Sequence, residues 1–403
     1  MAINVMNSRI PVSAVYRLTI LRRTTVVSRL AHPGPRNRTC HSATIFSTPR
    51  SFESRRPSWI LNLRTFASSS RQMAFSNEEL RHEGTQEETA GRQVSPLVTT
   101  SWLAENLSRV IPVDATWYLQ PDSSIASKGR RKDDNWVFDP AQGMKPKQPV
   151  KDARKEYAER HIQGARFFDI DHIADRLSSL PHMLPSPEEF EEHVGALGIT
   201  ENDHVVVYDL HGIFSSPRVW WTFKVFGHRN VSVLDGGLPK WLREGRHVTN
   251  EVDKAVKSTY RADFQEDLVI DYQTLLVHVT DFMYAKNFQI LDARPRGRFA
   301  GFTAEPRASL PSGHIPSAIN IPASELIDPE TKTMLPPQEI LRRMFIDNVD
   351  LDRPIVTMCG SGVTAATVFL ALEIVGKTGD VKLYDGSWTE WASKSKSPIK
   401  TWT

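Results

Sequence analysis

Cysteine is scarce in this sequence, whose 403 residues include only Cys40 and Cys359. Two cysteines cannot build a disulfide framework, and without a Cys-x-x-Cys pair the chain has no cysteine-built zinc site. Long apolar runs are missing too, since none approaches the roughly 20 residues that a helix needs to cross a bilayer. We therefore expect neither a disulfide-stapled scaffold nor a protein embedded in a membrane.

Acidic residues and lysine are almost absent from the first 73 residues, which contain twelve arginines, no lysine and a single acid, Glu53. Residues 74–403 hold 38 basic and 46 acidic side chains, a net charge of −8. A body this acidic is poorly suited to bind a phosphate backbone. Nucleic acid is therefore not expected as a partner.

The segment 1–73 also lacks the apolar core of about 7–15 residues that a secretory signal needs. Its arginine-rich, serine-rich, acid-poor composition is typical of a mitochondrial transit peptide, and the sequence RTFASS from Arg64 resembles a matrix-processing site. Cleavage between Ala67 and Ala74 would remove Cys40. We expect a mitochondrial matrix location, with a cytosolic fraction left open; the alternative is a disordered tail without a targeting role.

Past residue 92 the chain runs twice through the same series of segments. The matching segments begin, pair by pair, at Ile111 and Gln289, His161 and His314, His204 and Pro354, and Leu234 and Tyr384. Asp114 and Asp292, in the first pair, are 178 residues apart, whereas later pairs are separated by 150–153 residues. The first half thus carries about 25 extra residues, which we assign to an insertion at 123–150, expected to be a surface loop. Such self-similarity indicates an internal duplication.

Short apolar runs in each half alternate with stretches of helical length. The helices are expected at Glu188–Leu197, Val219–Phe226, Gln338–Phe345 and Val363–Val375. Alternating strands and helices predict an α/β fold in which a parallel sheet is flanked by helices on both faces. We expect two tandem domains of this kind, at 97–247 and 268–398, joined by a linker at 248–267 and preceded by the leader.

Cys359 follows the apolar run Pro354–Met358 and precedes the sequence GSGVT and an apolar helix. Ligands bind at the carboxyl ends of parallel strands, and two glycines allow several backbone N–H groups to converge there. The start of the helix adds a positive field, so a thiolate nucleophile is plausible. These features leave the alternative open, namely a free cysteine that acts as a small buried hydrophobe.

The sequence CGSGVTA from Cys359 resembles the active-site loop of the two-domain rhodanese superfamily, specifically its 3-mercaptopyruvate sulfurtransferase branch. Further motifs of this family occur in the right order along residues 97–391. They are DATWYL from Asp114, RFFDID from Arg166, HMLP from His182, SPRVWW from Ser216, DARPRGRF from Asp292, GHIP from Gly313 and YDGSWTEW from Tyr384. The resemblance implies two rhodanese-like domains, the first of which is catalytically silent and has Asp209 in place of the nucleophile.

The resemblance also assigns residues to the site. Arg298 and Arg307 match the family's substrate-binding arginines, whose planar guanidinium groups suit a carboxylate. Asp171 and His182 match first-domain residues that complete an arrangement with Ser361, expected to orient this serine and to manage a proton. Substrate binding through the rest of the loop is expected from Gly360, Gly362, Val363 and Thr364. Arg294 and Arg296 are weaker candidates, and His161 and His314 are expected to be structural.

The expected reaction moves sulfane sulfur from 3-mercaptopyruvate through a Cys359 persulfide to cyanide or a thiol acceptor, such as thioredoxin or a small thiol. No metal or organic cofactor is needed, because the cysteine itself carries the sulfur.

Thiosulfate sulfurtransferase is the nearest alternative, but its loop places cations after the cysteine, where this chain has Gly360 and Ser361. A relay that delivers sulfur to a thiolation or cofactor-assembly partner also remains open. A cysteine phosphatase is disfavoured, since its Cys-x5-Arg loop would need arginine where Ala365 stands.

Overall fold

The computed structural model describes residues 94–119, 136–139, 143–146, 151–281 and 287–402. The leader at 1–73 and the proposed processing site therefore lie outside the described residues, as does most of the insertion at 123–150. None of the helices in the described ranges combines the length and apolar character that crossing a bilayer requires.

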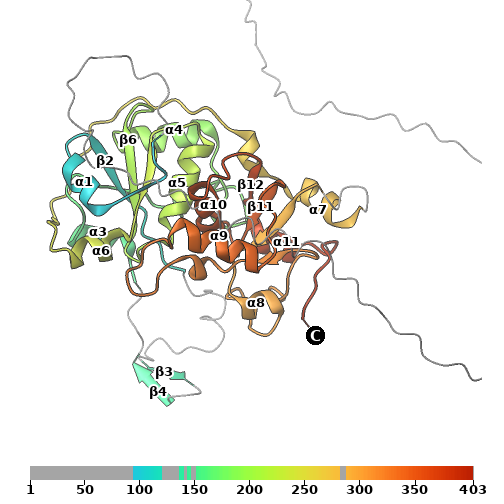
Figure 1. The fold of residues 1–403 in the computed structure, drawn as a ribbon. Coiled ribbons are helices and arrows are strands. Elements are labelled where there is room, and N and C mark those ends of the chain that lie inside the picture. Colours follow the sequence, from blue (N-terminus) through green and yellow to red (C-terminus); the bar gives the residue numbers. More distant parts are fainter. Residues whose placement is uncertain (1–93, 120–135, 140–142, 147–150, 282–286, 403) are drawn as a thin grey trace, which may run out of the picture. The chain divides into compact units, whose positions relative to one another are not determined.

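The first repeat is built on a five-stranded parallel sheet with the order β1-β7-β6-β2-β5. Its strands are β1 (Leu97–Val98), β2 (Val110–Asp114), β5 (Arg166–Phe167), β6 (His204–Tyr208) and β7 (Val231–Leu234). Its helices are α1 (Thr100–Asn106), α3 (Ala153–Glu159), α4 (Pro187–Ala196), α5 (Ser216–Val225) and α6 (Gly237–Arg243). Figure 1 shows these elements in blue to yellow-green.

The side chains of the central strand β6 explain why helices pack on both faces of this sheet. Val205 and Val207 join an apolar cluster that includes side chains of α4 and α5. Val206 and Tyr208 point to the opposite face and join a cluster with side chains of α1, α3 and α6. Because a strand alternates its side chains between two faces, a continuous apolar run such as this one is buried on both.

The second repeat has a sheet of the same kind, with the order β10-β9-β11-β12-β8. Its strands are β8 (Val269–Ile270), β9 (Gln289–Asp292), β10 (Ile319–Asn320), β11 (Ile355–Met358) and β12 (Val381–Tyr384). Its helices are η2 (Glu266–Leu268), α7 (Tyr272–Thr280), α8 (Arg296–Ala300), η3 (Ala323–Leu326), α9 (Pro337–Ile346), α10 (Ala365–Ile374) and α11 (Ser387–Ser393). When it is listed from β8 to β10, this order is that of the first sheet, element for element. The predicted duplication and the α/β fold are thus confirmed.

The four expected helices correspond to α4, α5, α9 and α10. The start of α5 differs most, because the helix begins at Ser216, three residues before the expected Val219. Pro217 in its first turn accounts for this difference, since proline has a φ that suits a first helical turn and lacks only an N–H that would be unpaired there. Within the insertion that we expected to be a loop, β3 (Trp136–Asp139) and β4 (Gly143–Pro146) pair as an antiparallel hairpin.

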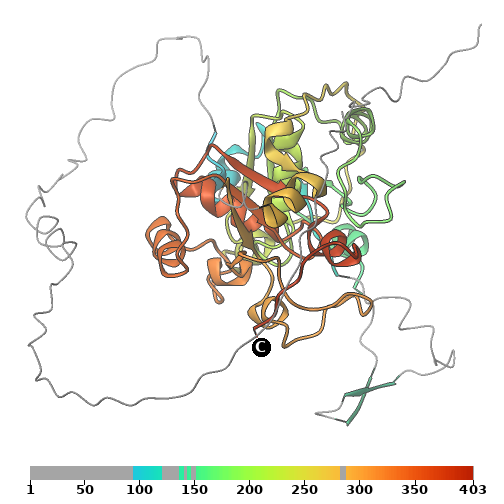
Figure 2. The same cartoon turned by 90° about the vertical axis from the view of Figure 1, so that its right-hand side faces the viewer.

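The helices that follow the central strands, α5 and α10, pack against each other (Figures 1 and 2). The rings of Trp220 and Phe369 meet edge to face with their centroids 6.0 Å apart. One helical turn further along, Lys224 Nζ lies 2.5 Å from Glu373 Oε2. One apolar cluster includes side chains of both repeats, so these halves share a core as well as a topology.

Candidate active site at the carboxyl end of β11

Cys359 directly follows β11 and is held by the first turn of α11. Its side chain forms no disulfide within the described residues, and the residue is only 2 % exposed. The Cys359 N–H donates to Ser387 Oγ at 3.1 Å, and the Trp388 N–H donates to the Cys359 carbonyl at 3.0 Å. Both peptide groups of the residue are therefore fixed before any ligand arrives.

The loop 360–364 connects Cys359 to α10 and presents unused backbone donors. Thr389 binds the Gly360 carbonyl twice, through its N–H at 2.9 Å and its Oγ1 at 2.6 Å. Within the described ranges, none of the five N–H groups of the loop finds an acceptor. Gly362 adopts a φ of +77°, the left-handed conformation that turns successive amides toward one side. The loop can therefore donate several hydrogen bonds to an anion at its centre.

Arg298 on α8 lies against this loop. Its Nη2 is only 3.0 Å from the point that a Cβ on Gly360 would occupy. Glu305 fixes its orientation by accepting hydrogen bonds from Nε, at 3.0 Å, and from Nη2. The guanidinium is partly exposed, so it can bind a ligand while Glu305 holds it.

Arg307 approaches from the same segment of the chain. Its Nη1 donates to Thr389 Oγ1 at 3.3 Å, and that hydroxyl is the group that binds the Gly360 carbonyl. Arg307 also lies close enough to Asp171 for its charge to lower the pKa of that carboxyl. This arginine therefore stands between the cysteine loop and the first repeat.

The two arginines that we ranked lower are committed elsewhere. Arg294 is buried, binds Asp292 and Glu305, and stacks with its guanidinium carbon 4.0 Å from the centre of the Trp388 ring. Arg296 forms an ion pair with Glu325 at 2.9 Å.

Asp171 and His182 of the first repeat form a pair. His182 Nδ1 lies 3.0 Å from Asp171 Oδ1, and Trp117 Nε1 donates to both carboxylate oxygens at 3.1–3.2 Å. Burial acts to raise the pKa of Asp171. The hydrogen bond and charge of His182, followed by the contributions of Trp117 and Arg307, outweigh burial, so this pKa lies below its ordinary value. Asp171 is therefore an anion at neutral pH.

His182 is buried, and its Nε2 has no hydrogen-bond partner among the described residues. Its φ of +62° is rare for a residue with a side chain. Ser361 is buried as well, but in the described part of the chain no hydrogen bond links it to Asp171 or His182. Asp171 and His182 are thus paired, while Ser361 is not hydrogen-bonded to either of them in the described residues.

The contact that joins these loops comes from Arg218 on α5, which sequence reasoning did not single out. Arg218 Nη1 donates to Asp385 Oδ1 at 2.6 Å and to the Gly362 carbonyl at 3.4 Å, and Nη2 donates to the His182 carbonyl. The signal was in the sequence SPRVWW, where one arginine stands among residues that are otherwise suited to a core.

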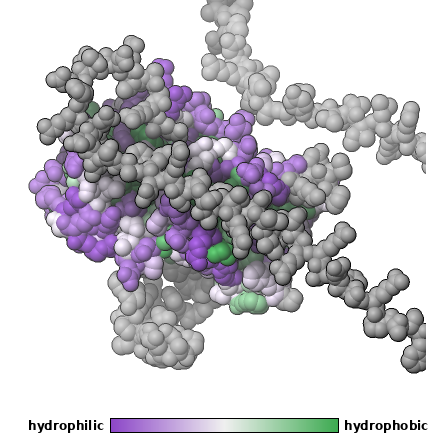
Figure 3. Space-filling model, in the orientation of Figure 1, coloured by the Kyte–Doolittle hydropathy of each residue, from purple (hydrophilic) through white to green (hydrophobic). Residues whose placement is uncertain are grey.

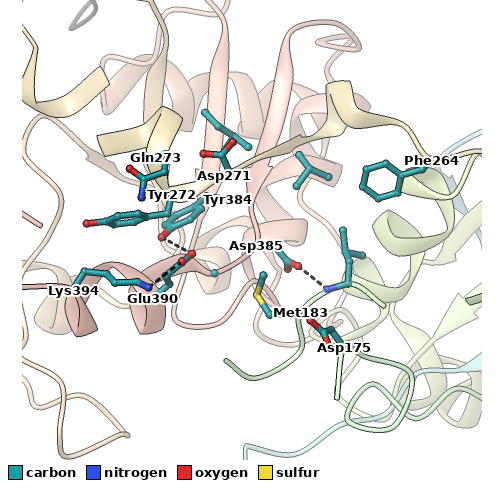
Figure 4. Close-up of a pocket in the computed structure, with 14 residues that line it drawn as sticks. Asp175, Met183, Phe264, Asp271, Tyr272, Gln273, Tyr384, Asp385, Glu390 and Lys394 are labelled. Atoms are coloured by element: carbon teal, nitrogen blue, oxygen red, sulfur yellow. Dashed lines mark hydrogen bonds and ion pairs between the residues drawn. The ribbon is translucent and has the colours of Figure 1, made fainter. Parts of the chain in front are cut away.

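Asp385, the ion-pair partner of Arg218, also binds the segment that carries His182. Its Oδ2 accepts a hydrogen bond of 2.8 Å from the Leu184 N–H (Figure 4).

Two hollows lie near these residues. The hollow in Figure 4, about 460 Å³, includes Met183, Asp385 and Glu390 in its lining but not Cys359. A smaller hollow of about 270 Å³ is bounded by Trp117 and Asp171 and so adjoins the candidate site. The part of the chain that the structure describes contains no cluster of His, Cys, Asp or Glu that could hold a metal ion.

Comparisons with known proteins agree with this architecture. The family model of the rhodanese-like domain matches residues 141–244 and 279–394. The mitochondrial thiosulfate/3-mercaptopyruvate sulfurtransferase 1 of Arabidopsis thaliana is 39 % identical over 76 % of this chain and 78 % of its own length. The human 3-mercaptopyruvate sulfurtransferase is 38 % identical over 74 % of this chain and 93 % of its own.

A solved structure shows the same relationship. The crystal structure of SseA from Escherichia coli, described as a 3-mercaptopyruvate sulfotransferase, matches with a TM-score of 0.60 and 33 % identity, covering 73 % of this chain and 99 % of that one. The resemblance inferred from the motifs is confirmed over both repeats: the chain belongs to the rhodanese family of sulfurtransferases.

Proposed function

We propose that this protein transfers sulfane sulfur from 3-mercaptopyruvate to a thiol or cyanide acceptor through a persulfide on Cys359. One observation carries the proposal: a fixed cysteine is followed by five backbone N–H groups that have no acceptor among the described residues. Donors arranged in this way stabilise negative charge, which a thiolate and a persulfide both bear.

The donor is proposed to bind through its carboxylate and keto oxygens. Arg298 and Arg307 are cations on one segment of the second repeat, and Thr389 connects Arg307 to the loop. A guanidinium can offer two parallel N–H groups to a carboxylate. Its fixed position would hold the donor sulfur over the cysteine rather than leave it to diffuse.

In the first half-reaction the Cys359 thiolate attacks the donor sulfur and forms an S–S bond. The C–S bond breaks, its electron pair stays on carbon, and pyruvate leaves as its enolate, which then takes up a proton. In the second half-reaction an acceptor thiolate attacks the outer sulfur, the S–S bond breaks, and the Cys359 thiolate is released. A small thiol or a protein such as thioredoxin is the proposed acceptor.

We assign the handling of the proton to Ser361, Asp171 and His182. The anionic Asp171 orients the imidazole of His182, whose buried Nε2 has no hydrogen-bond partner among the described residues. Ser361 lies in the cysteine loop, two residues after Cys359, and is the proposed link between this pair and the donor. The amides of Gly360, Gly362, Val363 and Thr364 are the proposed cradle for the sulfur.

The preference for mercaptopyruvate over thiosulfate follows from charge. The residues after the cysteine, Gly360 and Ser361, are uncharged, and Glu305 offsets the charge of Arg298 by pairing with it. This site suits a monoanionic carboxylate better than the dianion thiosulfate. Thiosulfate is proposed as a poorer donor that the same arginines can still attract.

The proposed location is the mitochondrial matrix, after removal of the leader, with a cytosolic fraction where the leader is retained. Support comes from the twelve arginines and single acid of residues 1–73 and from the mitochondrial relative in Arabidopsis thaliana. The N-terminal residue of the protein isolated from mitochondria, determined by mass spectrometry, should lie between Ala67 and Ala74. An intact leader on that protein would contradict the proposal.

The function is tested by comparing initial rates with 3-mercaptopyruvate and thiosulfate. The wild type should prefer the former, and Cys359→Ser should abolish both activities. After treatment with donor alone, mass spectrometry should show about 32 Da added at Cys359, the mass of one sulfur in the covalent intermediate. Cys40→Ser is the matched control and should behave as wild type. Equal rates with the two donors, or activity that survives in Cys359→Ser, would contradict the proposal.

A further inference from the structure

Arg218 belongs to the repeat without the cysteine, yet its guanidinium contacts the cysteine loop of the other repeat. The residue is 2 % exposed and lies on α5, the counterpart of the helix that follows Cys359. Its Nη1 donates to the Gly362 carbonyl and to Asp385 Oδ1. One side chain of the first repeat therefore fixes two segments of the second.

The second arm of the same guanidinium holds the loop of His182. Nη2 donates to the His182 carbonyl, while Asp385, the ion-pair partner of Arg218, accepts the N–H of Leu184 through its other oxygen. The backbone of this segment is thus held at two points, the carbonyl of His182 and the N–H of Leu184. This clamp supports a residue whose φ of +62° is strained unless its surroundings hold it.

The packing around Gly362 shows how closely these parts fit. A Cβ at Gly362 would lie 2.6 Å from Arg218 Nη1 and 3.1 Å from Asp385 Oδ1. The guanidinium also lies 4.8 Å from the centre of the Trp221 ring, which closes its remaining face. A buried ion pair with several added hydrogen bonds has a single geometry, so it can transmit position from one loop to the other.

We propose that Arg218 is a positioning residue for sulfur transfer: it holds the cysteine loop and the loop of His182 at a fixed separation. The inference rests on the proposed function and deepens it, because it gives the repeat without the cysteine a task in the reaction. Arg218 does not touch the reacting atoms. Its effect reaches them through the Gly362 and His182 carbonyls.

The test compares Arg218→Met with Lys224→Met. Both substitutions remove a cation of α5 that is paired across the interface between the repeats, but Lys224 binds Glu373 and touches neither loop. For the donor half-reaction, Arg218→Met should lower kcat by about tenfold to a hundredfold. KM should change less than threefold or so, since Arg298 and Arg307 still hold the donor. Lys224→Met should lower the thermal midpoint and leave kcat within about twofold of wild type.

A second variant and a double mutant separate positioning from simple loss of stability. Arg218→Lys keeps the charge for Asp385 but cannot reach all three acceptors as a fork, so kcat should fall while the thermal midpoint stays near that of wild type. If Arg218 acts through His182, adding Arg218→Lys to His182→Asn should lower kcat by much less than it does in the wild type.

Failure of the proposed sulfur transfer and failure of the proposed role of Arg218 give different results. A wild-type protein without Cys359-dependent transfer would overturn the proposed function and this inference together. A wild type that is active, with Arg218→Lys at wild-type kcat, would overturn the inference alone. So would a fall in kcat in Arg218→Lys that is fully additive with His182→Asn.

Discussion

Asp209 and Cys359 occupy the same position in the two repeats, directly after the central strands β6 and β11. Asp209 Oδ2 accepts hydrogen bonds from the N–H groups of Phe214, Ser215 and Ser216 at 2.9, 3.0 and 2.8 Å. The loop after Cys359 leaves its own N–H groups without acceptors among the described residues. The first repeat thus supplies its own anion, whereas the second leaves the place for a charged sulfur.

Removing that anion should destabilise the protein. In Asp209→Ala four N–H groups, two of them buried, and the Ser216 hydroxyl lose their acceptor. We therefore expect the free energy of unfolding in urea to fall by about 3 kcal/mol or more. Asp209→Asn keeps one oxygen acceptor and should lose less. Equal stability of Asp209→Ala and wild type would show that the amides do not depend on this carboxylate.

A buried aspartate in the first repeat should make stability depend on pH. Asp292, at the end of β9, is neutralised by Arg294 Nη2 at 2.6 Å, whereas its counterpart Asp114 is bound by uncharged groups: the N–H and Oγ1 of Thr116 donate to it at 2.9 and 2.5 Å, and the Tyr208 hydroxyl adds a smaller contribution. Burial raises the pKa of Asp114 from 3.8 to about 7, against the lowering effect of Thr116. Between these values the unfolded chain has released a proton that the folded protein keeps, so stability falls as pH rises from about 4 to about 7.

Asp114→Asn should remove this part of the pH dependence. Asparagine can accept both hydrogen bonds from Thr116 and carries no proton to lose. The variant should therefore gain stability relative to wild type as pH rises, reaching roughly 2–4 kcal/mol at pH 8. The measurement is urea unfolding at pH 4, 6 and 8, and a difference that stays constant across this range would contradict it.

The sequence was sufficient for the fold because the duplication repeats its landmarks. Each half carries the same apolar strands, which alternate between two covered faces, so the order of elements follows from the pattern. Cys359 could be singled out for the same reason, since it stands at a strand end before a glycine loop. The hairpin β3–β4 could not be predicted, because the composition of the insertion is that of a loop.

The contacts between the repeats could not be predicted from the sequence. Arg218 and Asp385 are 167 residues apart, and nothing local in either segment predicts a partner in the other. Arg298 and Arg307 could be chosen only through their match to a family motif. Their neighbours Arg294 and Arg296 have the same chemistry, and only the structure shows that Arg294 is buried between Asp292 and Glu305, that Arg296 pairs with Glu325, and that Arg298 lies against Gly360.

Gly362 should be sensitive to the smallest added side chain. Its φ is +77° and a Cβ there would approach Arg218 Nη1 to 2.6 Å. Gly376, at the end of α10, has a φ of +87° but nothing within 4 Å of its Cβ position. Gly376→Ala should therefore cost only the backbone strain, about 1 kcal/mol, and leave the sulfurtransferase rate unchanged.

Gly362→Ala should cost more than this control and should lower kcat by at least about tenfold, because the new methyl group displaces the guanidinium or the loop. Thermal unfolding and initial rates with 3-mercaptopyruvate measure the two effects. If both variants lose the same stability and keep the same rate, the close approach of Arg218 to the loop has no consequence for the reaction.

Arg298→Ala tests how the donor is held. The Arg298 guanidinium lies against Gly360 and is partly open to a ligand, and a hydrogen-bonded ion pair with a carboxylate is worth about 1.5–3 kcal/mol. We therefore expect the KM for 3-mercaptopyruvate to rise by about tenfold to a hundredfold. The change in kcat should be smaller, since the cysteine loop remains intact. Arg296→Ala is the matched control, because Arg296 lies two residues away on α8 and pairs with Glu325. A rise in KM that is equal in the two variants would mean that Arg298 acts through the general charge of the surface and not by binding the donor.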